Sequence, residues 1–119
     1  MRAAGCIAAA ALSAIALSCS DSRKVAGVVE DFMEANGAAW ETPSVRVVRV
    51  DSTYHVTPAR VERIRAAAER SGAAKPGAGY APPTRKLVYA VVEYGVGGGQ
   101  ARSTFYLDAD MERVVAFMP

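Results

Sequence analysis

Apolar and polar residues follow two different periods along this chain, and the alternation between them predicts the order of its elements. Five apolar residues share one helical stripe between Arg23 and Asn36, namely Val25, Val28, Val29, Phe32 and Met33. Ser22 is a suitable N-cap for this helix and Gly37 a suitable stop. We therefore expect a helix over 23–36 that packs through its apolar stripe on a sheet.

The next segment, Val45–Val56, alternates with the period of a strand. We expect one side to carry Val48, Val50, Tyr54 and Val56, and the other to carry Arg49, Asp51, Thr53 and His55. Asp51 and His55 would stand about 13 Å apart along a straight strand, too far for a hydrogen-bonded dyad. We interpret the polar row as the solvated face of an edge strand, with a polar binding surface as the alternative.

A second helix is predicted from Pro58, with Thr57 as N-cap and Gly72 as the stop. Its apolar stripe is narrow (Val61, Ile64 and Ala68), and Arg65 is expected to pair with Glu69 one turn away. The following stretch, 71–84, is rich in Gly, Pro and Ala, and we expect a mobile loop there.

The C-terminal third has the strongest β-forming character. The run Lys86–Tyr94 is apolar on both faces through Val92, which predicts a strand in the middle of a sheet. A turn at 95–100, a strand over 102–108 and a last strand over 114–118 complete the pattern. The sequence thus predicts an α+β fold in the order α-β-α-β-β-β, with a mainly antiparallel four-stranded sheet packed on the N-terminal helix.

The first 18 residues have the pattern of an export signal, in which Arg2 precedes an apolar run. This run is too short to span a bilayer, which takes roughly 20 residues, so a cleaved signal is expected rather than a permanent membrane anchor. The run 15–19, Ile-Ala-Leu-Ser-Cys, resembles the bacterial lipobox, although its Leu is one place late. This resemblance implies a signal peptide over 1–18, acylation of Cys19 by palmitate or a similar chain, a short tether over 19–22 and one domain over 23–119. The alternative is cleavage after Ala16, which would release a soluble periplasmic or secreted protein.

The composition of the chain argues against several kinds of site and partner. Cys19 would be the one cysteine left after cleavage and His55 is the one histidine, so the sequence predicts no disulfide, no metal site and no cofactor. The remaining 13 basic and 12 acidic side chains are nearly balanced, which argues against nucleic acid as a partner. No motif indicates a catalytic residue, and we expect a protein that is not an enzyme.

The pattern of 87–118, with a strand, a Gly turn, a strand ending in Leu-Asp-Ala and a final apolar strand, resembles the C-terminal region of PepSY-type and cystatin-like envelope domains. It implies fold class only. We expect a lipid-anchored envelope protein that binds a protein or peptide, with candidate surface residues Tyr89, Tyr94, Tyr106, Arg49, Asp51 and His55. Two alternatives stay open. One is a cone-shaped ligand-binding or enzymatic domain, with Asp51, His55 or Glu93 in a cavity beside Trp40 or Tyr54. The other is a subunit of an envelope-assembly complex.

Overall fold

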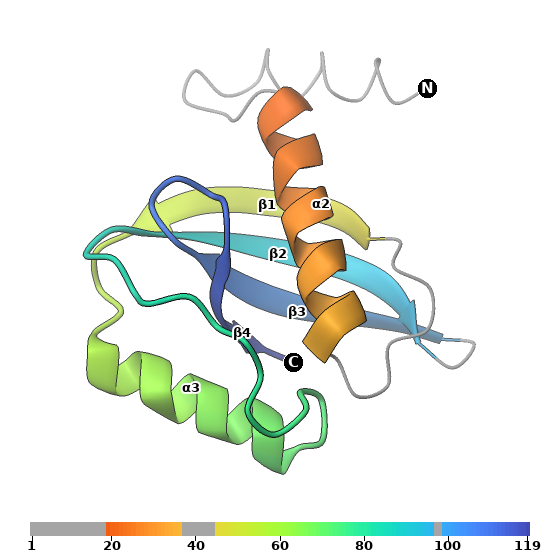
Figure 1. Ribbon diagram of the computed structural model, residues 1–119. Helices are drawn as coiled ribbons and strands as arrows, with labels where there is room; N and C mark the ends of the chain where they lie inside the picture. The colour runs from red at the N-terminus through yellow and green to blue at the C-terminus, as the bar shows by residue number, and fades with distance from the viewer. Residues whose placement is uncertain (1–18, 37–44, 97–98) are drawn as a thin grey trace.

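In the part of the chain that the structure describes, four antiparallel strands form a sheet in the order β1-β2-β3-β4, and two helices pack on it (Figure 1). This computed structural model describes residues 19–36, 45–96 and 99–119, so the predicted signal peptide and Trp40 lie outside the described residues. The elements are α2 (Cys19–Asn36), β1 (Val45–Thr53), α3 (Pro58–Arg70), β2 (Leu87–Val96), β3 (Gly99–Leu107) and β4 (Val114–Met118). The predicted α+β class and the predicted element order are both confirmed.

Helix α2 crosses the front face of the sheet and buries the predicted apolar stripe there (Figure 1). Val25 and Val29 are fully buried, and the Phe32 ring meets the rings of Phe105 and Phe117 edge-on at 6.4 and 5.9 Å. Alternate residues of β2 and β3 supply the other side of this front core, because successive strand side chains point to opposite faces. The front of the sheet is thus closed by a packed helix.

The start of α2 differs from the prediction. The helix begins at Cys19, so residues 19–22, expected to be a tether, form its first turn, and Ser22 is not the N-cap. Asp21 lies in that first turn, where a negative side chain favours the helix by complementing the helix dipole. Further along, the ammonium group of Lys24 donates to the carbonyl of Asp110 at 3.0 Å and holds the helix to the β3–β4 turn.

Strand β1 contains a β-bulge that the sequence pattern did not indicate. Val47 pairs with Val92 and Arg49 with Val91, so Val48 is an extra residue on β1. Val47 and Val50 therefore both pack on the front core, whereas Val48 is 39% exposed. The prediction that Val48 and Val50 share a buried side is wrong, and the strand ends at Thr53 rather than at Val56.

Helix α3 begins as predicted and lies beside β4. The hydroxyl of Thr57 accepts the N–H of Arg60 at 3.2 Å, and Pro58 occupies the first turn. The three residues of the narrow apolar stripe are all buried. Two of them, Val61 and Ile64, cluster with residues of the opposite, rear face of the sheet, namely Leu87, Tyr106, Val115 and Ala116. This helix therefore covers the rear face only near β4.

Arg65 joins α3 to the rest of the domain, although not through the predicted pair with Glu69. It pairs with Glu62 at 3.3 Å and donates to the carbonyls of Ala81 and Val115, both at 2.9 Å. Glu69 instead accepts the N–H of Gly77 at 3.1 Å. The guanidinium group has N–H donors in several directions, so Arg65 reaches two backbone carbonyls and Glu62 together, and it does not pair with Glu69.

The Gly- and Pro-rich segment after α3, where we expect a mobile loop, makes specific contacts with the rest of the domain. The N–H of Lys75 donates to the carbonyl of Asn36 at 2.8 Å, and the N–H of Ala81 to the carbonyl of Val114 at 2.8 Å. The Tyr80 ring stacks on Phe32 at 5.2 Å and faces the Arg65 guanidinium at 4.8 Å. Burial raises the pKa of the Tyr80 hydroxyl, and the Arg65 charge partly opposes this.

Candidate binding surface

Charged and aromatic side chains form ordered rows on the rear face of the sheet, which points away from the viewer in Figure 1. The register places Glu93 of β2 directly between Arg46 of β1 and Arg102 of β3. Two residues along β2, Val91 lies between Arg49 and Thr104. Residues that are direct cross-strand partners share a face, so each row presents its side chains together.

Glu93 holds two arginines from neighbouring strands. Its Oε2 accepts from Nη2 of Arg102 at 2.6 Å and from Nε at 3.2 Å, and its Oε1 accepts from Arg46. The hydrogen bonds from Arg102 and then from Arg46 hold the pKa of the Glu93 carboxyl below its usual range. The side chain of Glu93 is 18% exposed, against 72% for Arg46 and 61% for Arg102. Solvent therefore meets the guanidinium groups above a covered carboxylate.

Arg49 lies over an aromatic ring in the same region. Its guanidinium carbon is 5.8 Å from the centre of the Tyr89 ring, and a guanidinium nitrogen is 3.8 Å from the carboxylate of Asp51. Tyr89 in turn contacts Tyr106 with ring centres 6.4 Å apart. The cation–π contact limits the positions that the Arg49 side chain adopts.

We call the open part of the rear face the arginine shelf; it consists of Arg46, Arg49, Tyr89, Val91, Glu93, Arg102 and Thr104.

The outer edge of β1 is poorly suited to pairing with a strand of another protein. The rear face is therefore the better candidate for binding. The N–H of Val45 donates to the carboxylate of Glu30 at 3.2 Å, and the N–H of Ser52 donates to the carboxylate of Asp51 at 2.8 Å. The bulge at Val48 also interrupts the regular ladder. Bulges and charged side chains are common means by which proteins prevent edge-to-edge pairing.

Of the six candidate surface residues, the structure brings four together on the rear face, namely Arg49, Asp51, Tyr89 and Tyr106. Tyr94 lies on the front face, where its hydroxyl and that of Ser103 are 2.6 Å apart in the buried interior. Tyr106 is itself 92% buried beside α3. His55 is exposed beyond the end of β1, and its backbone N–H donates to the hydroxyl of Thr53.

Sequence reasoning named Glu93 only as a possible cavity residue and did not identify Arg46 or Arg102, so it missed the central group that these three residues form. The signal was present, since each residue interrupts or flanks an apolar strand pattern with a charge. The register that places the three charges in one row depends on the β1 bulge and the β2–β3 pairing. A bulge changes which residues share a row, so counting along β1 alone could not identify the group.

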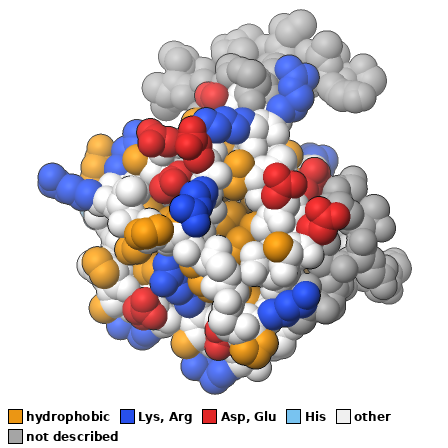
Figure 2. All heavy atoms as spheres, viewed as in Figure 1, with side chains coloured by type: hydrophobic (Ala, Val, Ile, Leu, Met, Phe, Trp, Pro, Cys, Tyr) orange, Lys and Arg blue, Asp and Glu red, His pale blue; other side chains and the backbone are white. Residues whose placement is uncertain are grey.

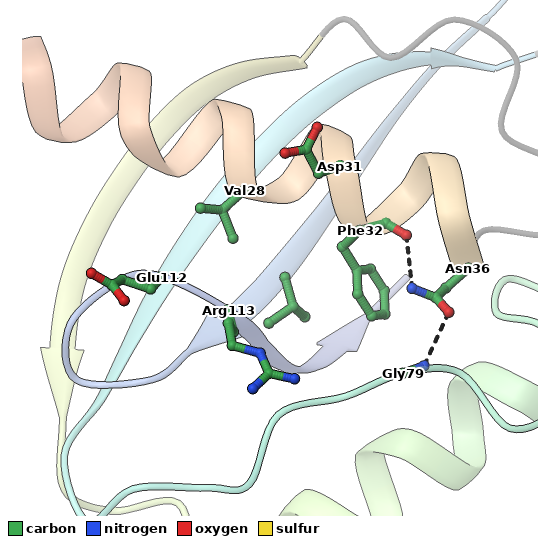
Figure 3. A pocket seen from close by; sticks show the side chains of 8 residues that line it. Val28, Asp31, Phe32, Asn36, Gly79, Glu112 and Arg113 are labelled. Atoms are coloured by element: carbon green, nitrogen blue, oxygen red, sulfur yellow. Dashed lines mark hydrogen bonds between the residues drawn. The ribbon is translucent and has the colours of Figure 1, made fainter.

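The cone-shaped alternative places its cavity beside Trp40 or Tyr54, and Trp40 lies outside the described residues. Packed aromatic and aliphatic side chains fill the space between α2 and the sheet. Asp51 and His55 are exposed, and Glu93 points away from α2. A shallow open groove of about 230 Å³ does lie beside α2; it is lined by Val28, Asp31, Phe32, Asn36, Gly79, Glu112, Arg113 and Val114 (Figure 3).

This groove does not gather groups that suggest chemistry. The side chain of Asn36 spans one end of it, donating to the carbonyl of Phe32 and accepting the N–H of Gly79 (Figure 3). Acidic and basic side chains are interspersed on the α2 side of the molecule (Figure 2). We therefore regard the arginine shelf as the better candidate surface.

Within the described ranges, no group of three or more His, Cys, Asp or Glu side chains is placed to hold a metal ion. None of the helices in the described part of the chain combines the length and the apolar character that crossing a membrane requires. Comparisons of the chain with protein-family models, curated proteins and solved structures give no match. The similarity of 87–118 to PepSY-type and cystatin-like domains therefore stays a resemblance.

Proposed function

We propose that this chain is a lipid-anchored, non-enzymatic protein of the cell envelope that binds another protein or peptide through the arginine shelf. The sequence supports the anchor: an apolar leader precedes a lipobox-like run that ends in Cys19. The observation that carries the binding role is the open rear face, where α3 leaves a set of ordered guanidinium and aromatic groups uncovered.

The composition of this face supports a protein partner. Arg and Tyr are enriched where proteins bind each other, because both combine a flat apolar surface with hydrogen-bonding groups. The carboxylate of Glu93 and the ring of Tyr89 hold the guanidinium groups before any partner arrives, which reduces the entropy lost on binding.

The anchor also restricts where the partner can be. Since α2 begins at Cys19, an acylated Cys19 would connect the lipid to the first helical turn with no intervening flexible segment. Several acyl chains together hold a protein stably at a membrane, because each buried methylene contributes about 0.8 kcal/mol. The partner would then be another component of the envelope surface, reached within a short distance of the bilayer.

Mass spectrometry of the mature N-terminus tests the anchor, and photocrosslinking tests the surface. We expect an acylated Cys19 as the first residue. A photoreactive residue in place of Thr104 on the shelf should give a crosslinked protein in intact cells, whereas one in place of Ala67, an exposed position on α3, should not. A free Leu17 start would contradict the anchor. Equal crosslinking from Thr104 and Ala67, or none from either, would contradict the binding surface.

A further inference from the structure

We infer that the arginine shelf binds an acidic segment of the partner, one that places two or more carboxylates against Arg46, Arg49 and Arg102. This inference rests on the proposed function and adds the chemical class of the ligand. It follows from which charges a partner would meet at the surface of the shelf and from how far apart they lie.

The outermost charges of the shelf are all positive. The three arginine side chains are 72%, 64% and 61% exposed, while Glu93 is 18% exposed beneath two of them. The other carboxylate nearby, Asp51, is 55% exposed; it pairs with Arg49 and accepts the backbone N–H of Ser52. An approaching segment therefore meets guanidinium groups first at Arg46 and Arg102 and an arginine–aspartate pair at Arg49, and the excess of positive charge favours carboxylates.

Each guanidinium retains N–H donors after its internal contacts. Arg102 uses Nε and Nη2 for Glu93, and Arg46 uses Nη2, whereas a guanidinium group has five N–H donors in all. The remaining donors suit a carboxylate, which accepts two parallel N–H bonds from one arginine. A lysine at these positions would offer a point charge without this geometry.

The spacing of the arginines fits an extended acidic segment. Arg46 and Arg49 pair with residues two apart on β2, which corresponds to about 7 Å along the strand. Arg46 and Arg102 lie on either side of β2, so their backbones are about 10 Å apart. Carboxylates at positions i and i+2 of an extended peptide are also about 7 Å apart. The ring of Tyr89 lies one row beyond Arg49 and Val91 on β2, so it would accept an apolar side chain at the next position of the segment that faces the shelf.

Selection from a random peptide library on the immobilised full chain, purified from membranes, is the first test. We expect enrichment of peptides with paired Asp or Glu residues. The selected peptide, labelled with a fluorophore, is then titrated with the protein at low and at high salt. Exposed arginine–carboxylate pairs each contribute a few-fold to affinity, so replacing all three arginines with Gln should weaken binding about tenfold or more. Raising the salt should weaken binding to the unmodified chain.

A matched variant removes charge elsewhere. Arg60 and Arg63 lie exposed on α3, and their replacement by Gln should leave the affinity unchanged. A variant with Lys at the three shelf positions keeps the charge and should still bind less tightly, because it loses the paired N–H geometry. Circular dichroism verifies that each variant folds. In the triple Gln variant Glu93 is left without its arginine partners, so a further variant adds Glu93→Gln to remove this carboxylate.

Four outcomes would overturn the inference. They are enrichment of basic or purely apolar peptides, binding that is insensitive to salt, equal loss in the Arg60/Arg63 variant, and tighter arginine-dependent binding to phosphatidylglycerol vesicles than to the selected peptide. The last would identify an anionic membrane as the ligand. If Thr104 crosslinks a partner whose binding ignores the three arginines, the proposed function stands and this inference fails. If the acidic peptide binds but no partner crosslinks in cells, the anion preference stands and the proposed function fails.

Discussion

Replacing Arg65 with Met should destabilise the domain more than any other single change of an arginine on α3. The Arg65 side chain is 21% exposed and donates to two backbone carbonyls, those of Ala81 and Val115, at 2.9 Å each. Hydrogen bonds that involve a charged group contribute about 1.5–3 kcal/mol each, and the partial exposure places these near the lower end. Losing the cation–π contact with Tyr80 adds about 0.5–1 kcal/mol. Met retains most of the packing of the aliphatic stem.

We therefore expect the free energy of unfolding to fall by about 3.5–4 kcal/mol, a large part of the 5–15 kcal/mol typical of a domain. Urea titration followed by circular dichroism measures the change, with Arg63→Met on the exposed side of α3 as the control. The control should stay within about 0.5 kcal/mol of the unmodified protein. Arg65→Lys should recover about half of the loss, because one ammonium group cannot reach two carbonyls with the same geometry.

Limited trypsin digestion adds a local measurement. Arg65 connects α3 to the segment that leads into β2, so its loss should speed cleavage after Arg85 more than cleavage elsewhere. Equal stability of the Arg65→Met and Arg63→Met proteins would refute this reasoning, and it would mean that water replaces the guanidinium group at both carbonyls without cost.

Three further predictions concern single groups. Tyr80→Phe should leave the free energy of unfolding unchanged or raise it by up to about 1 kcal/mol, because the buried Tyr80 hydroxyl has no hydrogen-bond partner. Tyr94→Phe should lower it by about 1 kcal/mol, because it removes the contact with Ser103. Thermal unfolding compares the two variants. The pKa of Glu93 is lowered in the folded protein, so its stabilising effect is present above the unfolded pKa near 4.5 and is lost as the pH falls through the folded value. Urea titrations across this acidic range should accordingly show a smaller loss of stability in Glu93→Gln than in the unmodified protein. Gly72→Ala should cost about 1–2 kcal/mol in a urea titration, because the φ of Gly72 is +83° and a Cβ disfavours this conformation.

The elements of this fold could be predicted from the sequence because their signals are local. The stripe from Val25 to Met33, the Thr57-Pro58 start of α3 and the apolar run of β2 each act within a few residues. The β1 bulge could not be predicted this way. It depends on how Val47 and Arg49 align with β2, which lies some forty residues further along the chain.

The candidate surface was predictable only in part for the same reason. A polar row on β1 and tyrosines on β2 and β3 were visible as residue types, but which of them share a face depends on register and on the covering helices. Tyr94 shows this clearly: it is two residues from Val92 on β2 and therefore faces the front core, where its hydroxyl lies 2.6 Å from the hydroxyl of Ser103. The contacts of the segment after α3 were also hidden, since its Gly and Pro content indicates a turn-rich path but does not indicate what holds it.

The open rear face could be no more than the solvated side of an antiparallel sheet, since such sheets commonly have one side in water. Solubility alone asks only for polar side chains, and flexible lysines would supply them. The described part of this face instead carries arginines, each held by a carboxylate or a ring, and no lysine. Holding long side chains in place costs conformational entropy, and exposed ion pairs return at most about 1 kcal/mol each to stability. The ordered arginines therefore contribute little to the stability of the fold. A ligand with matching carboxylates would bind more tightly, because the guanidinium groups are already in position.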